Sequence, residues 1–318
     1  MTGRLVISLD FELMWSVRDH RTTAEYGDAV LGGRAAIPEV LKRFASRGIR
    51  ATWATVGFVF AQTRDEILDH AAHVRPHYLD PRSSPYAFIQ NGLGRNENED
   101  PLHFGYSLVE RIAETHGQEV ATHSFSHFCC LEPGHSPDAF AADLTAAHNI
   151  ARTKGHRLET LVFARNQMDD RYVSIAKAQG IKAYRGNPPG FAYSPRPASE
   201  NGKIIRLARL LDSVIPVAGR LDYPDPSRDA GVTNIPASRF LRPFNPAYPA
   251  FSWFQVRRIH REMEIAARDN RIYHLWWHPH NFGRSTAGNL RQLDSILDRF
   301  VELRGRYGMQ SCTMKDLS

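Results

Sequence analysis

Cysteine is scarce in this sequence. The 318 residues include three cysteines, Cys129, Cys130 and Cys312, two of them adjacent, and no Cys-x-x-Cys pair occurs. An odd number of cysteines in this arrangement supports neither a disulfide framework nor a zinc site built from thiolates. Any metal ion would therefore have to be held by histidine and carboxylate side chains.

Long apolar runs are also missing. No stretch approaches the roughly 18 apolar residues of a membrane-spanning helix. The first apolar segment begins at Arg4, which leaves no room for the charged and apolar regions of a signal peptide. We therefore expect a cytoplasmic protein without an integral membrane segment.

No interior stretch rich in Gly, Ser and Pro, or in charges of one sign, separates two halves of the chain. We therefore expect a single domain over residues 1–318, with insertions at about 73–104 and 187–250. The 40 basic and 34 acidic residues give a net charge of +6, and the basic residues are scattered rather than clustered. This distribution argues against a nucleic-acid partner and is compatible with a small anionic substrate.

Strand-like and helix-like patterns alternate along the chain. One helical pattern carries Ile37, Val40 and Phe44 on one face and ends at Gly48. Strands are predicted at 5–9, 51–56, 119–122, 161–163, 183–184 and 272–277, and further helices at 60–71, 108–115, 139–151, 172–179, 204–211, 256–268 and 290–307. Repeated strand–helix units predict an α/β fold with parallel strands and outer helices, of the distorted or incomplete (β/α) barrel type.

Polar residues follow the ends of several predicted strands, where the chemistry of (β/α) barrels collects. Asp10 and Glu12 end the first strand, and because side chains alternate along a strand they point the same way. Two acids at the edge of a core need a cation, a metal ion or a substrate proton nearby. Later strands are followed by a histidine-containing segment at 123–127, by Arg165, by Arg185 and Asn187, and by His278.

Histidines four residues apart occur as three pairs, His73/His77, His123/His127 and His274/His278. The first pair lies in the predicted insertion and is interpreted as surface loop. In the last pair, His274 is expected to be a hydrogen-bonded core histidine. Only the His123/His127 pair opens a loop directly after a strand, so we interpret these two side chains as metal ligands.

Taken together, Asp10-x-Glu12, His123-x-x-x-His127, Arg165 after a strand and Leu275-x-x-His278-Pro279 resemble the polysaccharide deacetylase family, the NodB-homology carbohydrate esterases of family 4. The resemblance covers most of the chain. It differs in having Asp-Phe-Glu where many members have two adjacent aspartates, and Ala164-Arg165-Asn166 where an Arg-x-Pro motif is usual. The chain looks most like the deacetylase-like proteins of bacterial O-antigen and other surface-polysaccharide synthesis.

The resemblance implies hydrolysis of an N-acyl group by a divalent metal ion, expected to be zinc. It assigns the metal to Glu12, His123 and His127, the general base to Asp10, the orientation of Asp10 to Arg165, and protonation of the leaving nitrogen to His278. A histidine suits the last role because its ordinary pKa lies near neutrality. Exchanged roles for Asp10 and Glu12 stay open, because their spacing does not say which one reaches the metal.

The expected substrate is an N-acetylated sugar, free or linked to a nucleotide or a lipid, used for surface polysaccharide or lipopolysaccharide. An N-deformylase of a formamido-sugar, or a non-catalytic carbohydrate-binding protein on the same fold, are the alternatives. Three residues stay unassigned. His280 could line the site or face solvent, and Arg185 and Asn187 could bind substrate or form a plain turn.

Overall fold

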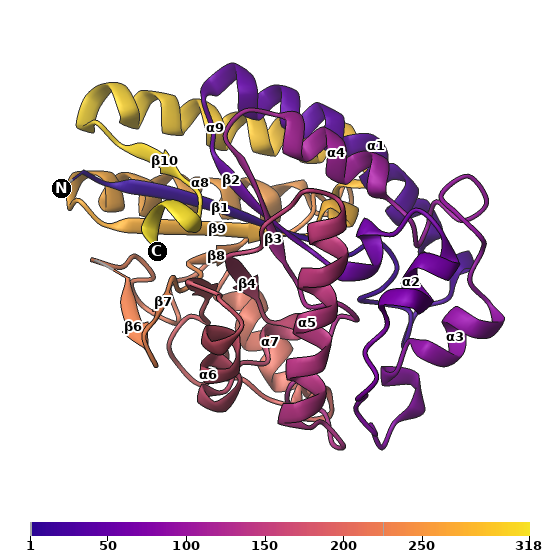
Figure 1. Cartoon of the computed structure of the whole chain (residues 1–318). Helices are drawn as coiled ribbons and strands as arrows, with labels where there is room; N and C mark the ends of the chain where they lie inside the picture. Colours follow the sequence, from indigo (N-terminus) through magenta and orange to yellow (C-terminus); the bar gives the residue numbers. More distant parts are fainter. Residues whose placement is uncertain (1, 225) are drawn as a thin grey trace.

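A curved sheet forms the centre of the computed structural model, which describes residues 2–224 and 226–318 (Figure 1). Its strands are β1 (Arg4–Phe11), β2 (Ala51–Thr55), β3 (Gln118–Thr122), β4 (Thr160–Val162), β5 (Ala183–Arg185), β6 (Ser227–Asp229), β7 (Val232–Asn234), β8 (Arg239–Phe240), β9 (Ile272–Trp277) and β10 (Gln310–Cys312). They lie in the order β6-β7-β5-β4-β3-β2-β1-β9-β8, and β10 pairs with β1. Neighbouring strands are parallel except β6 and β7.

The sheet curls into an incomplete barrel because the chain from 232 to 241 changes partner. Strand β7 pairs with β5, whereas β8 pairs with β9 at the other end of the strand order. Between them, the Ala237 amide donates to the Gly186 carbonyl at 2.9 Å and the Ser238 amide to the His274 carbonyl at 2.8 Å. This short segment takes the place of the continuous strand pairing that closes a complete barrel. The predicted distorted or incomplete (β/α) barrel is confirmed.

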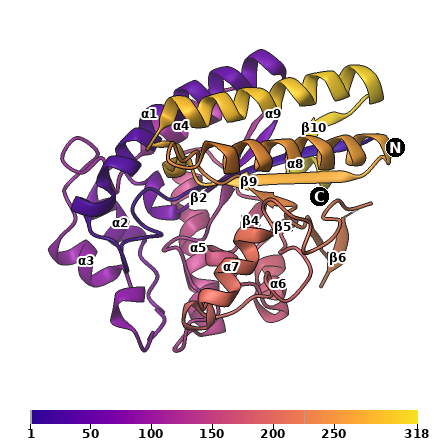
Figure 2. The ribbon, with the colours of Figure 1, turned by 180° about the vertical axis from the view of Figure 1, so that it is seen from behind.

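Helices cover the outside of the sheet, as Figures 1 and 2 show from two sides. Helices α1, α4 and α9 lie along one side, α8 packs behind β1 and β9, and α5, α6 and α7 lie along the other side. Their bounds, with those of the smaller α2 and α3, are α1 (Thr23–Arg47), α2 (Arg64–His70), α3 (Tyr86–Asn91), α4 (Tyr106–Glu114), α5 (Pro137–Thr153), α6 (Asp170–Ala178), α7 (Lys203–Leu211), α8 (Pro249–Arg268) and α9 (Thr286–Tyr307).

Helix α1 illustrates how local sequence sets these elements. Thr22 caps its start by accepting a hydrogen bond from the Glu25 amide while the Glu25 carboxylate accepts one from the Thr22 amide. Gly48 ends the helix with φ of +66°, a left-handed conformation that glycine adopts without a steric penalty. The predicted apolar face, including Ile37 and Phe44, is buried against the sheet, and the predicted end at Gly48 is confirmed.

The two regions expected as insertions differ from each other. Residues 73–104 are mainly loop, with α3 and a short turn of 3₁₀ helix at Pro81–Ser83. Residues 187–250 contain the predicted helix near 204–211, now seen as α7, but they also supply β6, β7 and β8. No strand was predicted within 187–250, because these three strands are too short to show an alternating pattern.

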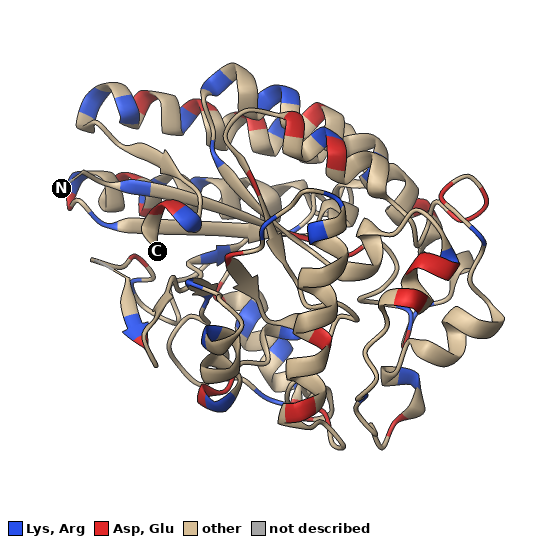
Figure 3. Ribbon diagram, in the orientation of Figure 1, with Lys and Arg blue, Asp and Glu red and all other residues tan. Residues whose placement is uncertain are grey.

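Charged residues are interspersed on the outer helices, with blue and red segments alternating along α1 and α9 in Figure 3. None of the helices within residues 2–224 and 226–318 is both long and apolar enough to cross a lipid bilayer.

Candidate functional site

Asp10 and Glu12 lie at the carboxyl end of β1, between β2 and β9 in the strand order. Both side chains are buried, as expected for the end of a central strand. His278, which follows β9, approaches both of them. Its Nε2 lies 3.7 Å from Asp10 Oδ2 and 3.6 Å from Glu12 Oε2. The two acids therefore share one site, as their spacing in the strand predicted.

The loop that carries His123 and His127 follows β3 and has an unusual backbone. Ser124 and His127 have φ of +62° and +58°, in the left-handed region that non-glycine residues rarely adopt. Local hydrogen bonds hold this conformation, because the Phe128 amide donates to Ser124 Oγ at 2.7 Å and the Ser124 amide to Thr122 Oγ1 at 3.0 Å. Such backbone strain persists where the surroundings fix it, which is common at functional sites.

Asp143 anchors the same loop from helix α5. Its buried carboxylate accepts the Phe125 amide at 2.7 Å, and both the amide and the hydroxyl of Ser126. Burial raises the pKa of Asp143 to about 6, against the opposing effect of these hydrogen bonds. Asp143 was not among the predicted site residues, although an aspartate on the otherwise apolar face of α5, between Phe140 and Leu144, is a visible signal.

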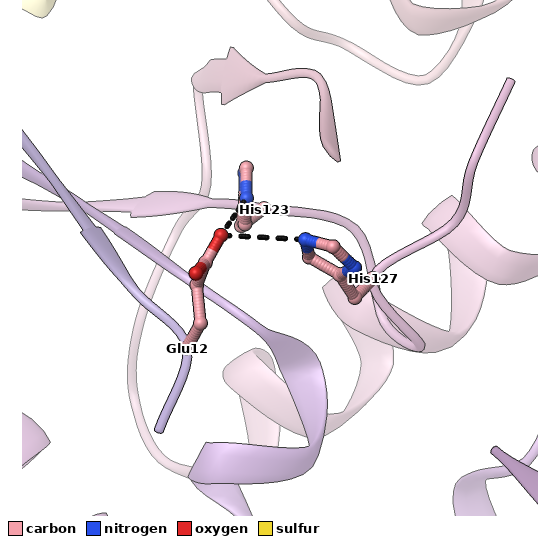
Figure 4. A group of neighbouring side chains, drawn as sticks. All are labelled: Glu12, His123 and His127. Atoms are coloured by element: carbon pink, nitrogen blue, oxygen red, sulfur yellow. Dashed lines mark hydrogen bonds and ion pairs between the residues drawn. The ribbon is translucent and has the colours of Figure 1, made fainter. Parts of the chain in front are cut away.

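Glu12, His123 and His127 bring their polar atoms together, as Figure 4 shows. Glu12 Oε1 lies 2.8 Å from His123 Nε2 and 3.3 Å from His127 Nε2, and one ligand atom from each residue falls within 4.8 Å of the others. Glu12 Oε2 and His127 Nε2 are buried without a hydrogen-bond partner among the described residues. We call these three side chains the carboxylate–histidine cluster.

The hydrogen bonds of His123 decide which of its ring nitrogens can act as a ligand. Its Nδ1 lies 2.7 Å from the Val162 carbonyl, which can only accept, so Nδ1 carries a proton. The contact between Nε2 and Glu12 then needs either a second ring proton or a cation between two acceptors. Burial alone would lower the pKa of His123, but the Glu12 carboxylate outweighs it and raises this pKa. By contrast, burial lowers the pKa of His127 to about 4 and leaves it neutral, the form that binds metal ions.

Arg185, at the end of β5, holds Asp10. Its two terminal nitrogens donate to the two carboxylate oxygens at 2.6 and 2.7 Å, and both side chains are almost fully buried. The guanidinium also lies over the ring of Trp276, 4.2 Å from its centroid, and donates to Ser8 Oγ. Burial would raise the pKa of Asp10, but the Arg185 charge, followed by that of His123, lowers it below its usual value. Asp10 is therefore an ionised carboxylate fixed in one orientation.

The structure corrects the prediction that Arg165 orients Asp10. Arg165 forms an ion pair with Asp19 and lies 3.8 Å from Glu132. The physical reason is local, because Arg165 and Asn166 both have φ of +55° and the chain turns directly after β4. Strand β5 instead ends with Arg185 on the inner face of the barrel.

His278 and His280 lie next to each other beyond β9. His278 Nδ1 contacts Asn281 Oδ1 at 3.2 Å, which turns Nε2 towards the carboxylates. His280 is buried and its ring stacks on that of His278, with centroids 4.9 Å apart. The backbone of His280 packs closely against Gly33 of α1, because glycine has no Cβ. A Cβ at Gly33 would lie only 2.6 Å from His280 Cα. His280 therefore does not face solvent, one of the two positions that the sequence left open.

His274 occupies a structural position below the site, as predicted. Its ring contacts Ser8 Oγ at 2.9 Å and the Ile235 carbonyl at 3.1 Å, and it is fully buried. The side-chain Nδ2 of Asn187 donates hydrogen bonds to the carbonyls of Asn166 and Tyr193, at 2.9 and 3.0 Å. The amide of Asn187 thus stabilises the loop beyond β5 at a position that also lines a cavity.

A cavity of about 390 Å³ extends from His278 towards α7. We call it the arginine cavity, after a property of its lining that sequence reasoning did not reveal. Its walls include Trp276, Phe240, Tyr193, Ser238, Asn166, Asn187, Arg165, Arg196, Arg206, Arg209, Arg239 and Arg242. Aromatic surfaces beside polar groups suit a sugar ring, which has apolar faces and hydroxyl edges.

Comparison with known proteins gives matches in structure only. No protein-family model and no curated protein sequence matches the chain. A Mycobacterium smegmatis protein assigned as a polysaccharide deacetylase superposes with a TM-score of 0.60 at 12% identity, covering 99% of this chain and 88% of its own. A Pseudomonas aeruginosa protein with the same assignment gives 0.56 at 13% identity, covering 99% and 89%.

The 4-alpha-glucanotransferase of Thermococcus litoralis also superposes, with a TM-score of 0.56 at 10% identity. It covers 100% of this chain, which spans 40% of that enzyme. At such identities the likeness establishes the fold and leaves the reaction to the site. The chain has a polysaccharide deacetylase-like fold of the NodB-homology type, the fold that its acidic and histidine motifs predicted.

Proposed function

We propose that this protein is a metal-dependent hydrolase that removes an N-acyl group, in the first instance N-acetyl, from a sugar. The observation that carries the proposal is the carboxylate–histidine cluster. Its three side chains converge at the carboxyl edge of the barrel, and two buried polar atoms in it have no hydrogen-bond partner among the described residues. Two histidines and one carboxylate with open positions form the ligand set of many catalytic zinc sites.

Glu12, His123 and His127 would hold the ion, and zinc is the ion that their chemistry favours. When bound, such an ion polarises an acyl carbonyl and lowers the pKa of a water molecule. The Val162 carbonyl orients His123 for this purpose, and Asp143 fixes the loop that joins the two histidines. The protein thus keeps the ligands in place through its own hydrogen bonds.

Asp10 and His278 would move the protons. Asp10 is ionised and held by Arg185, so its carboxylate can accept a proton from an attacking water. His278 Nε2 faces both acids and borders the arginine cavity, where it can donate a proton to the leaving nitrogen. In this scheme Arg185 takes the orienting role that the sequence assigned to Arg165.

The fold alone also allows glycoside chemistry, as the glucanotransferase shows. Retaining glycosidases use one carboxylate as nucleophile and a second carboxyl group with a raised pKa as acid. Here burial raises the pKa of both acids, but neighbouring charges and hydrogen bonds outweigh it. Arg185 brings the pKa of Asp10 below its usual value. His278, with the two cluster histidines, does the same for the pKa of Glu12. Neither carboxyl group suits the role of a protonated acid, which favours amide hydrolysis.

The finer identity of the substrate belongs to the same proposal. By resemblance, we place the reaction in the cytoplasm, on an acetamido-sugar destined for bacterial O-antigen, lipopolysaccharide or another surface polysaccharide. Release of formate from a formamido-sugar would use the same groups with a smaller acyl pocket.

A combined metal and product analysis tests the proposal. The purified chain is loaded with zinc, and acetate or formate release is measured from N-acetylated and N-formylated sugars. We expect one tightly bound ion per chain and product release, both lost in Glu12→Ala and His127→Ala. His77→Ala is the matched control, because His77 ends another His-x-x-x-His pair but is exposed.

Two results would contradict parts of the proposal. Unchanged metal content in Glu12→Ala and His127→Ala would remove the metal site. Metal binding without release of either acid from any N-acylated sugar would favour a non-catalytic carbohydrate-binding protein.

A further inference from the structure

Four arginines around the arginine cavity lack an acidic partner within the part of the chain that the structure describes. Arg196, Arg206, Arg209 and Arg242 all line it, and none forms an ion pair with any residue in 2–224 or 226–318. Most other arginines of the chain do form such pairs, including Arg239 in the same wall. An unpaired cluster of like charges repels itself, so its presence in one cavity calls for a compensating ligand.

The acid that directly follows α7 is already engaged. Asp212, directly after α7, is buried and forms ion pairs with Arg239 and Arg258. It also accepts the hydroxyl of Tyr193 at 2.7 Å. The partners of Asp212 are therefore Arg239, Arg258 and Tyr193, and none of them is one of the four unpaired arginines.

The unpaired guanidinium groups use only part of their hydrogen-bonding capacity. Arg209 Nε donates to the Ala192 carbonyl at 2.6 Å, Arg206 Nε to the Asn201 carbonyl at 3.0 Å, and Arg242 to the Arg209 carbonyl at 3.0 Å. Arg242 Nε is buried without a partner among the described residues. Since each guanidinium has five N–H donors, several are free to bind a ligand.

The electrostatics of Arg209 reflect this crowding. Burial lowers the pKa of its guanidinium, and the charges of Arg196, Arg242 and Arg206 lower it further. Helix α7 contributes Arg206 and Arg209 and contains no acidic residue between Lys203 and Leu211, as its colouring in Figure 3 shows.

We propose that the arginine cavity binds a phosphate or diphosphate group carried by the acylated sugar. Arginine is suited to phosphate because its planar fork donates two parallel hydrogen bonds to neighbouring oxygens. The same cavity is lined by His278, so an anion held by α7 places the rest of the ligand towards the carboxylate–histidine cluster. This inference rests on the proposed function and narrows its substrate to a sugar phosphate ester.

Such an ester can be soluble or can belong to a lipid. Helix α7 exposes 77% of Ile204 and 54% of Leu207 while its arginines line the cavity. The exposed apolar residues give a lipid-linked phosphate a surface to approach, whereas a soluble ester does not need them. The experiment therefore includes one arm for each source.

The first arm measures binding of inorganic pyrophosphate by calorimetry at fixed ionic strength, without any acylated substrate. We expect saturable binding that weakens about tenfold in Arg206→Gln and in Arg242→Gln, as expected for loss of one charge-assisted contact. Arg111→Gln on α4 is the matched control, because Arg111 is exposed and has no ion pair among the described residues. Arg206 is exposed, so its substitution should not impair folding, and melting temperatures verify this.

The second arm uses vesicles of phosphatidylglycerol and phosphatidylcholine in equal parts. A lipid source predicts sedimentation with these vesicles that is lost in Arg206→Gln and in the double variant Ile204→Ser, Leu207→Ser. A soluble source predicts pyrophosphate binding that the double variant leaves intact. Absence of binding in both arms, or binding that Arg206→Gln and Arg242→Gln do not weaken, would overturn the proposal.

Activity measurements separate this inference from the proposed function. The ratio of kcat/KM for N-acetylglucosamine 1-phosphate to that for N-acetylglucosamine should fall about tenfold in Arg206→Gln. Equal turnover of both sugars without pyrophosphate binding would leave the hydrolase and remove the anion site. Pyrophosphate binding without acyl release would leave the anion site and remove the hydrolase.

Discussion

The carboxylate–histidine cluster and the arginine cavity meet at His278, yet their charges are compensated in opposite ways. Around the cluster, Asp10 is paired with Arg185 and Glu12 with two histidines. In the cavity, four arginines are left without an acidic partner among the described residues. The same barrel edge therefore carries one region of matched charges and one of unmatched charges.

The difference shows how the two regions can act. Burying charges is costly unless they are paired, and a paired, fixed carboxylate is ready for proton transfer without reorganisation. Unpaired arginines keep their hydrogen-bonding capacity for a ligand, at the cost of mutual repulsion in its absence. We therefore expect substitutions in the cluster to damage the free protein, and those in the cavity to affect mainly its ligand.

The largest effect should come from substituting Asp10 and Glu12 one at a time. We expect Asp10→Asn to keep one metal ion per chain and lower kcat roughly a thousandfold, because it removes the proton acceptor and leaves the ligands. Glu12→Gln should lose the ion as well as the activity. Metal analysis and acetate release on the same samples check both statements. Retention of metal in Glu12→Gln with loss in Asp10→Asn would show that the roles are exchanged.

The next effect concerns the two arginines, because the sequence assigned the orientation of Asp10 to Arg165 whereas the structure pairs Asp10 with Arg185. Arg185→Gln removes both short hydrogen bonds to the buried Asp10 carboxylate, so we expect a loss of about 3 kcal/mol in the free energy of unfolding. Arg165→Gln leaves Asp19 with its second partner His20, so the loss should stay near 1 kcal/mol. Urea denaturation measures both. An equal or larger loss in Arg165→Gln would contradict the assignment of Arg185 as the partner that matters.

Sequence patterns predicted the features that depend on neighbouring positions. The alternation of side chains in β1 placed Asp10 and Glu12 on one face, and the spacing of His123 and His127 after β3 indicated their convergence. The apolar face of α1 and its glycine cap were equally local. Such features follow from backbone geometry within one element.

Features that join distant segments could not be derived in this way. The choice of Arg185 over Arg165 depends on left-handed φ angles after β4, which no residue type there requires. Strands β7 and β8 are so short that only their partners β5 and β9 define them. The arginine cavity joins residues from several loops and α7, and the lack of acids among its described lining residues becomes visible only when their side chains are placed.

A smaller effect extends the comparison to Asp143, a buried acid without an ion pair among the described residues. Burial raises its folded-state pKa to about 6, so between about pH 4 and 6 the folded protein holds a proton that the unfolded chain releases. This contribution to stability is therefore fully present at low pH and is lost as the pH rises to 6, by at most about 3 kcal/mol.

The difference in unfolding free energy between the wild type and Asp143→Asn isolates this group from the other acids. We expect this difference, wild type minus variant, to fall from about pH 4 to 6 and then stay level. A difference that rises with pH would mean that the three donors from Phe125 and Ser126 outweigh burial.

The smallest effect on the free energy of unfolding should come from Arg209→Gln, and its sign should be opposite to that of Arg185→Gln. Arg209→Gln removes one of four unmatched charges and loses one hydrogen bond to the Ala192 carbonyl. Relief of repulsion and loss of that bond nearly offset each other, so the free energy of unfolding without anions should rise by less than about 1 kcal/mol. Added pyrophosphate should stabilise the wild type more than the variant. If Arg209→Gln instead destabilises the free protein as much as Arg185→Gln does, the cavity arginines are structural and the contrast between the two regions fails.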